Sequence, residues 1–225
     1  MPKYKSDNLK YPTSNKLNQV FCFEIITTTW PNDGMPTNDQ QRSRTMAELK
    51  REFRMSQREE IVGIGISCVV FGENIIVHEP TVILVSPKLS EVSDKTLVSL
   101  AVDRQTFENH AVPLLEAMWQ MRAFGADAGS LPVWACWGDF PARKIKRDCE
   151  RVKARHPFSS RMINTKVIAS LVINQGVDLS MSQIGDEADL TMFVDDARLK
   201  TFNDGSRDIY NNTSVSSGIL GWCLS

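Results

Sequence analysis

Apolar and polar positions along the chain change their spacing in an order that predicts strands first and helices later. Residues 20–28 (VFCFEIITT) are rich in aromatic and β-branched side chains and predict a buried strand that carries a single acid, Glu24. Two more strands are predicted at residues 59–71 and 75–87, separated by the turn sequence Gly-Glu-Asn. Three strands in succession indicate an antiparallel meander.

The second half of the chain predicts helices that alternate with short strands. Residues 131–139 (LPVWACWGD) predict a buried strand, and residues 140–155 predict an amphipathic helix. A strand-to-helix transition is expected at residues 162–176 and a closing helix at residues 188–204. Residues 89–124 have helical spacing, with an apolar stripe formed by Phe107, Ala111, Leu114, Leu115, Met118 and Trp119.

The predicted elements define one domain between two tails. We expect residues 1–17 to form a polar tail, residues 18–204 the domain, and residues 205–225 a polar C-terminal tail, loose until its last apolar residues. Residues 31–58 are inserted between the first two strands, where a short turn would suffice. This insertion carries a capping box at Thr45 and Glu48 and six basic residues from Arg42 to Arg58, and it is the expected site for a protein partner.

Composition limits the class of protein. The chain has 225 residues, of which 42% are hydrophobic and 24% charged, enough to bury a full core. Its formal charge of -1 gives no general attraction to phosphate, so nucleic acid would have to meet a local basic patch. Five cysteines without a close pair suit a reducing compartment, cytoplasmic or nuclear. No apolar run is long enough to span a membrane, and no membrane contact is expected.

Several short motifs follow one another in a characteristic order. They are Glu24 with Thr27 on the first strand, EEIVGIG on the second, then WGDFPARKIKRDCE, MINTK and DDARLKTF. In order and spacing this set resembles the DEDDh-type 3′-5′ exonucleases, in particular the branch of the histone-mRNA and small-RNA exonucleases and the sporulation-inhibitor homologues. The resemblance runs from about residue 20 to residue 202. It implies an RNase H-like α/β fold with a mixed central sheet flanked by helices.

The resemblance also implies a site with two Mg²⁺ or Mn²⁺ ions, held by carboxylates from the first strand, the segment after the fourth strand and the closing helix, with a histidine base. Glu24 and Asp196 retain family positions as candidate catalytic and metal-binding residues. The other family positions fall on Cys22, Pro141 and Thr191. A thiol is a poor ligand for these hard ions, proline has no donor atom, and threonine is no base near neutral pH. We therefore expect an impaired exonuclease homologue with no cofactor or only weakly bound Mg²⁺ or Mn²⁺.

An active enzyme remains the alternative at this stage. Asp139 lies two residues before Pro141, so a rebuilt carboxylate site of Glu24, Asp196 and Asp139 could support metal-dependent 3′-5′ cleavage of RNA or single-stranded DNA. A purely structural role is also open for both retained acids. Glu24 would then pair with a nearby Lys or Arg, and Asp196 would be a solvated helix residue.

The predicted helix at residues 140–155 has a basic outer face. A solvated surface is the simpler interpretation, and contact with RNA or single-stranded DNA is the functional one. Neither this helix nor the insertion interleaves aromatic residues with its basic ones. The expected function is binding of nucleic acid or a protein without cleavage. The candidate nucleic-acid-binding residues are Arg143, Lys144, Lys146, Arg147 and Arg151.

Overall fold

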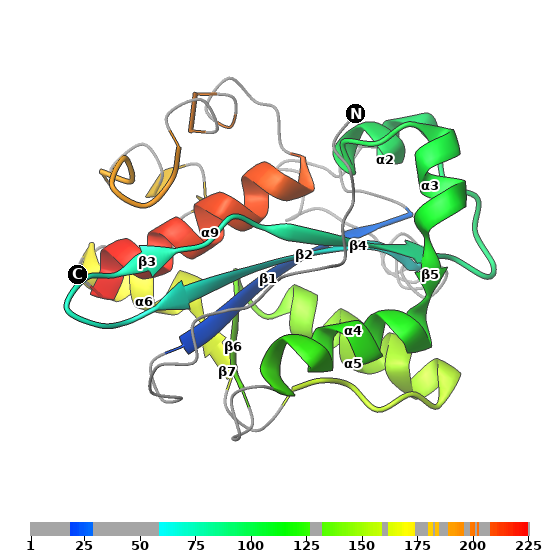
Figure 1. Ribbon diagram of the computed structural model, residues 1–225, viewed down its shortest axis with the longest axis horizontal. Helices are drawn as coiled ribbons and strands as arrows, with labels where there is room; N and C mark the ends of the chain where they lie inside the picture. Colours follow the sequence, from blue (N-terminus) through cyan, green and yellow to red (C-terminus); the bar gives the residue numbers. More distant parts are fainter. Residues whose placement is uncertain are drawn as a thin grey trace, which may run out of the picture.

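The computed structural model describes residues 19–28, 59–126, 132–158, 162–173, 180–181, 183–184, 189–195, 199–200, 202 and 208–224. They form an α/β structure in which helices cover both faces of a mixed sheet (Figure 1). The predicted fold class is confirmed. The N-terminal tail, the insertion at residues 31–58 and Asp196 lie outside the described residues.

The sheet contains seven strands in the part of the chain that is described, in the order β5-β4-β2-β1-β6-β7 with β3 paired to β2. Strands β1, β2 and β4 are antiparallel neighbours, which confirms the predicted meander. The pairs β1–β6, β6–β7 and β4–β5 are parallel. The strands are β1 (Gln19–Thr27), β2 (Ile61–Val70), β3 (Ile76–Val77), β4 (Thr81–Ser86), β5 (Val112–Pro113), β6 (Val133–Cys136) and β7 (Met162–Asn164).

The two faces of the sheet bury different side chains of the same strands. On one face, Phe21 and Phe23 of β1 pack with Trp134 under the helices α4 (Leu114–Ala126) and α5 (Phe140–Val152). Cys22 lies between these two residues, so its side chain points to the other face of the sheet. There it packs against Leu220 of α9 (Ile209–Leu224). Helices α2 (Asp94–Ser99), α3 (Arg104–His110) and α6 (Thr165–Val172) complete the described set.

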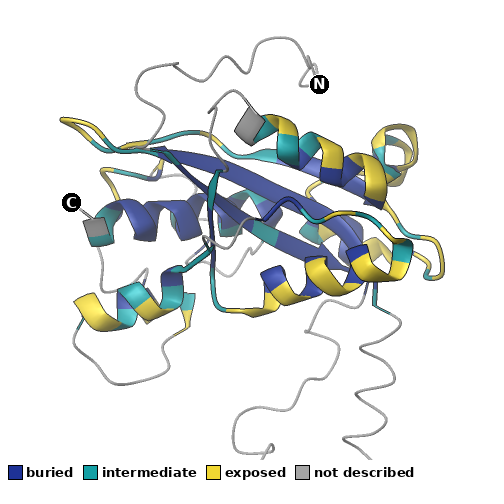
Figure 2. Cartoon of the chain, turned by 90° about the horizontal axis from the view of Figure 1, so that it is seen from below, coloured by how far each residue is buried: buried dark blue, intermediate teal, exposed yellow. Residues whose placement is uncertain are grey.

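Helix α9 corrects the prediction of a loose C-terminal tail. It packs against β1 and β2 and is buried along most of its length, dark blue in Figure 2. The close approach depends on β2 glycines, since a methyl group at Gly65 would collide with the Thr213 hydroxyl. The polar sequence is compatible with burial because Thr213 Oγ1 donates to Ile209 O (2.6 Å) and Ser217 Oγ to Thr213 O (2.6 Å) within the helix.

Two other predicted elements are divided. The strand expected at residues 75–87 is split into β3 and β4, and the helical segment at 89–124 is split into α2, α3 and α4. A new helix begins at Asp103, because its carboxylate caps the start of α3 and accepts from Thr106 N at 2.6 Å. The prediction of a single buried apolar stripe is therefore wrong. Leu114 and Met118 are buried, whereas Leu115 and Trp119 are 52% and 63% exposed.

Candidate functional site

Glu24 lies at the centre of β1, on the face covered by α9. Its β2 neighbour is Gly65, whose missing side chain leaves the space that Thr213 of α9 fills. Strand β6 runs parallel to β1 with Ala135 beside Cys22, so the chain leaves β6 next to Glu24. There the backbone N–H of Trp137 donates to Glu24 Oε1 at 3.0 Å.

The surroundings of Glu24 favour its uncharged form. The residue keeps some accessible surface, but burial of its carboxyl group raises the pKa to about 8, against the opposing effect of the Trp137 N–H and the Ser216 hydroxyl. Ser216 faces Glu24, although its geometry falls short of a well-formed hydrogen bond. Within the described part of the chain, backbone and hydroxyl groups contact this carboxyl group in place of the expected Lys or Arg.

Cys22 is fully buried between the flanking strands. It lies beside Ser67 of β2 and Ala135 of β6 and packs with Val69 and Leu220. Burial, followed by the nearby Glu24 charge, raises the pKa of the thiol well above its usual value. The group at the family's first aspartate position is thus a neutral thiol in an apolar layer.

The segment after β6 brings one acid to the same edge of the sheet. Asp139 precedes α5, is exposed, and accepts from Asn164 Nδ2 at 2.9 Å. Pro141 is buried in the first turn of α5, where its missing N–H costs nothing. Proline is thus a helix-starting residue at the family's middle aspartate position, and Asp139 is the carboxylate that the turn offers.

The closing segment differs from the one predicted. Thr191 is exposed, and its hydroxyl donates to Asp189 Oδ1 at 2.5 Å. The helix that covers Glu24 is α9, and the acid that opens it is Asp208, which accepts from Asn211 N at 2.8 Å and Asn211 Nδ2 at 3.1 Å. Sequence analysis missed Asp208; its signal was an Asp three residues before an Asn at a helix start.

Among the described residues, hydroxyl groups of α9 lie over Glu24. Ser216 follows Asp208 by eight residues, or about 12 Å along a helix axis, so Asp208 is out of reach of an ion bound to Glu24. In the ranges that are described, no three His, Cys, Asp or Glu side chains gather as a metal site would require. By themselves, the described groups around Glu24, which are one carboxyl group, a buried thiol and hydroxyls, do not supply the set of oxygen ligands that a two-ion centre for Mg²⁺ or Mn²⁺ needs.

The candidate nucleic-acid-binding residues separate into two groups on α5. Arg143, Lys146 and Arg147 are exposed, as predicted. The placement of Lys144 on the outer face is wrong: its side chain is 1% exposed and its Nζ lies 2.7 Å from Asp148 Oδ2. Lys144 also donates to Glu59 O at 2.6 Å, so it joins α5 to the start of β2.

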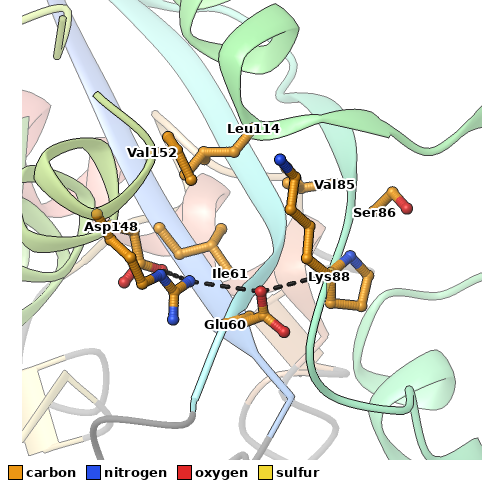
Figure 3. A pocket seen from close by; sticks show the side chains of 10 residues that line it. Glu60, Ile61, Val85, Ser86, Lys88, Leu114, Asp148 and Val152 are labelled. Atoms are coloured by element: carbon orange, nitrogen blue, oxygen red, sulfur yellow. Dashed lines mark hydrogen bonds and ion pairs between the residues drawn. The ribbon is translucent and has the colours of Figure 1, made fainter. Parts of the chain in front are cut away.

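Arg151 is exposed, as predicted, but it also joins a network centred on the buried Glu60 (Figure 3). Glu60 is buried and accepts from the backbone N–H groups of Lys88 (3.0 Å), Leu89 (2.6 Å) and Ser90 (2.8 Å). Arg151 Nη2 lies 3.4 Å from Glu60 Oε1. Burial opposes ionisation, but these donors and the Arg151 charge outweigh it and lower the pKa of Glu60. The network ties β2, α5 and the segment after β4 together, and sequence analysis missed it.

Solved structures with the same fold are 3′-5′ exonuclease domains. The nuclease domain of 3′hExo, a DEDDh family member bound to rAMP, superimposes with a TM-score of 0.59 at 12% identity over 94% of both chains. Cell-death related nuclease 4 (CRN-4) gives a TM-score of 0.57 at 11% identity over 94% of this chain and 64% of the other. The chain therefore has the RNase H-like fold of the DEDDh exonuclease domains.

Comparison of sequences alone gives a shorter likeness. No family model matches the chain. It is 37% identical over 110 residues to the tRNA 5-methylaminomethyl-2-thiouridine biosynthesis bifunctional protein MnmC of Burkholderia orbicola (strain MC0-3), a match that covers 42% of this chain and 16% of that protein. The corresponding protein of Burkholderia cenocepacia (strain HI2424) is 33% identical over 115 residues, a match that covers 46% of this chain and 17% of that protein.

None of the described helices is both long and apolar enough to cross a membrane.

Proposed function

We propose that this protein is a catalytically impaired homologue of the DEDDh-type 3′-5′ exonucleases that binds RNA or single-stranded DNA without cleaving it. The shared fold supports the relationship to exonuclease domains. One observation carries the loss of catalysis: Glu24 is covered by the Ser/Thr face of α9, with a buried thiol two residues away on the same side of β1.

The chemistry of phosphodiester cleavage explains why this arrangement is insufficient. Two-ion catalysis needs anionic oxygens that hold both ions and a base that prepares the attacking water. Burial raises the pKa of Glu24 to about 8 and so disfavours the anion that an ion would need, and the thiol of Cys22 is a weak ligand for hard ions. Thr191 supplies no base. The metal ligands and the base act together in one catalytic step, so the loss of either one alone greatly lowers the rate of cleavage.

Binding without cleavage can persist because it depends on charge and not on the metal site. The basic surface of α5 and the six basic residues of the insertion support contact with phosphates. A cytoplasmic or nuclear location and a protein partner at residues 31–58 are further parts of this proposal.

The test measures cleavage and binding on the same preparation. Purified protein with Mg²⁺ or Mn²⁺ and 5′-labelled single-stranded RNA or DNA should release no nucleotides above a buffer control, while binding of the same strands persists in EDTA. Thermal unfolding should not respond to millimolar Mg²⁺ or Mn²⁺. Chelator-sensitive digestion that disappears in both Glu24→Ala and Asp139→Ala would establish the rebuilt-site enzyme instead.

A further inference from the structure

The outer side of α4 presents a large aromatic side chain to solvent. Trp119 is 63% exposed, and Leu115, one turn earlier on the same helix, is 52% exposed. The Arg122 guanidinium carbon lies 5.6 Å from the centroid of the Trp119 ring. This pairing of an exposed indole with a cation is not needed for the core, because Met118 and Met121 supply the buried side of α4.

Cations dominate the surface that α4 shares with α5. Both helices lie below the sheet in Figure 1, opposite α9, and pack into one hydrophobic cluster. Apart from the internally paired Lys144, Asp148 and Arg151, residues 114–126 and 140–155 carry two acids, Glu116 and Glu150. They carry six cations: Arg122, Arg143, Lys146, Arg147, Lys153 and Arg155.

The charges that act on His156 are mostly positive. Burial lowers the pKa of His156, and the charges of Lys146, Arg122 and Arg155 lower it further, opposed by Glu150. His156 Nδ1 and Arg122 Nη2 are both buried without a hydrogen-bond partner among the described residues. Buried polar atoms are normally paired, so these two atoms add polar character beneath the positively charged surface, which favours an anion there.

We propose that the outer surface of α4 and α5 is the binding surface for single-stranded nucleic acid, with a base stacked on Trp119 and backbone phosphate held by Arg122, Lys146 and Arg155. The proposal rests on the proposed function and names its surface. A base has a π-face for the indole, and its phosphate matches the adjacent cations. An acidic protein would satisfy the charges but would not require the exposed indole. The surface lies on the opposite side of the sheet from Glu24, so strands bound here do not reach the inherited site.

Binding of fluorescently labelled oligothymidine and oligouridine by the full chain, measured by anisotropy over a range of salt concentrations, tests the proposal. Trp119→Ala should weaken binding roughly 5- to 150-fold, the usual effect of losing one stacked base, and Trp119→Phe should retain most of it. Lys146→Gln and Arg155→Gln should each reduce the slope of log K against log salt by about 0.7. Val98→Ala and Lys95→Gln, at exposed positions of α2, are the matched controls and should bind like wild type.

The possible outcomes are distinguishable. If wild type binds and the three surface variants bind equally well, this surface is wrong while the proposed function stands. If folded wild type binds no single strand at any salt concentration, the proposed function fails as well. Self-association of the wild type that Trp119→Ala abolishes, with nucleic-acid binding unchanged, would assign the surface to a second copy of the chain and overturn the proposal.

Discussion

At the residue scale, Glu24 shows how its surroundings decide what an inherited acid can do. In the folded protein its pKa is raised by burial to about 8, whereas in the unfolded chain it is near 4.5. Between these two values the folded state retains a proton that the unfolded state releases, so the free energy of unfolding falls as pH rises through this window. Ionisation of this carboxyl group therefore opposes folding.

Replacement of Glu24 by Gln should therefore stabilise the protein in a pH-dependent way. The difference in free energy of unfolding between Glu24→Gln and wild type, measured in urea, should increase from pH 5 to pH 9, because the amide cannot ionise. Glu116→Gln, at an exposed position of α4, is the control and should show no comparable trend. A difference that stays constant with pH, or decreases, would contradict the protonated state of Glu24.

At the scale of an element, α5 is held to the sheet by charge as well as by apolar packing. Ile145 and Cys149 fill the core under β1, while the Lys144–Asp148 pair, 1% and 2% exposed, connects the helix to Glu59 O. Burial lowers the pKa of Lys144, and its bond to Asp148 opposes that effect. The pair therefore stabilises α5 while both partners are present, but one partner alone is a buried, unpaired charge.

Removal of one partner of this pair should be far more damaging than removal of both. Asp148→Ala should lower the free energy of unfolding by about 3–5 kcal/mol, whereas the double variant Lys144→Met/Asp148→Leu should recover most of that loss. Arg143→Ala, on the exposed side of the same helix, should change stability by less than about 0.5 kcal/mol. Equal losses in Asp148→Ala and Arg143→Ala, determined by denaturant unfolding, would disprove the structural role of the pair.

At the scale of the whole molecule, the insertion begins and ends at neighbouring points of the sheet. Thr28 N donates to Glu60 O at 2.9 Å, and Glu60 N donates to Thr28 Oγ1 at 3.2 Å. These bonds, together with the β1–β2 ladder, hold the two strands in register independently of the chain between them. A short turn can therefore join Thr28 to Glu59 without moving either strand.

Replacement of residues 31–58 by a short Gly-containing turn should leave thermal stability nearly unchanged and weaken nucleic-acid binding, because the deletion removes six basic residues. Thermal unfolding and anisotropy on the same variant check both parts. A variant with those six residues changed to Gln separates loss of charge from loss of chain. An unfolded deletion variant would show that the segment contributes to the core.

The sequence by itself determined the elements whose pattern is local. The runs of aromatic and β-branched residues in β1 and β2, the apolar spacing of Ile145 and Cys149 on α5, and the strand-to-helix change at residues 162–172 could all be predicted because each depends on residues close together in sequence. The poor metal-ligand chemistry of Cys22 and Pro141 could also be predicted, since donor chemistry belongs to the side chain itself.

Tertiary structure alone decided what happens to polar residues, because their burial depends on partners distant in sequence. Lys144 is a surface residue by periodicity and a core residue by its bonds to Asp148 and Glu59. The hydroxyls of α9 indicate a loop in sequence but are buried against Gly65 and Glu24 once the helix packs on the sheet. Trp119 continues an apolar stripe yet is exposed, because α3 and α4 are separate helices with separate buried sides. Periodicity reports which residues share a face, and only packing determines which face is covered.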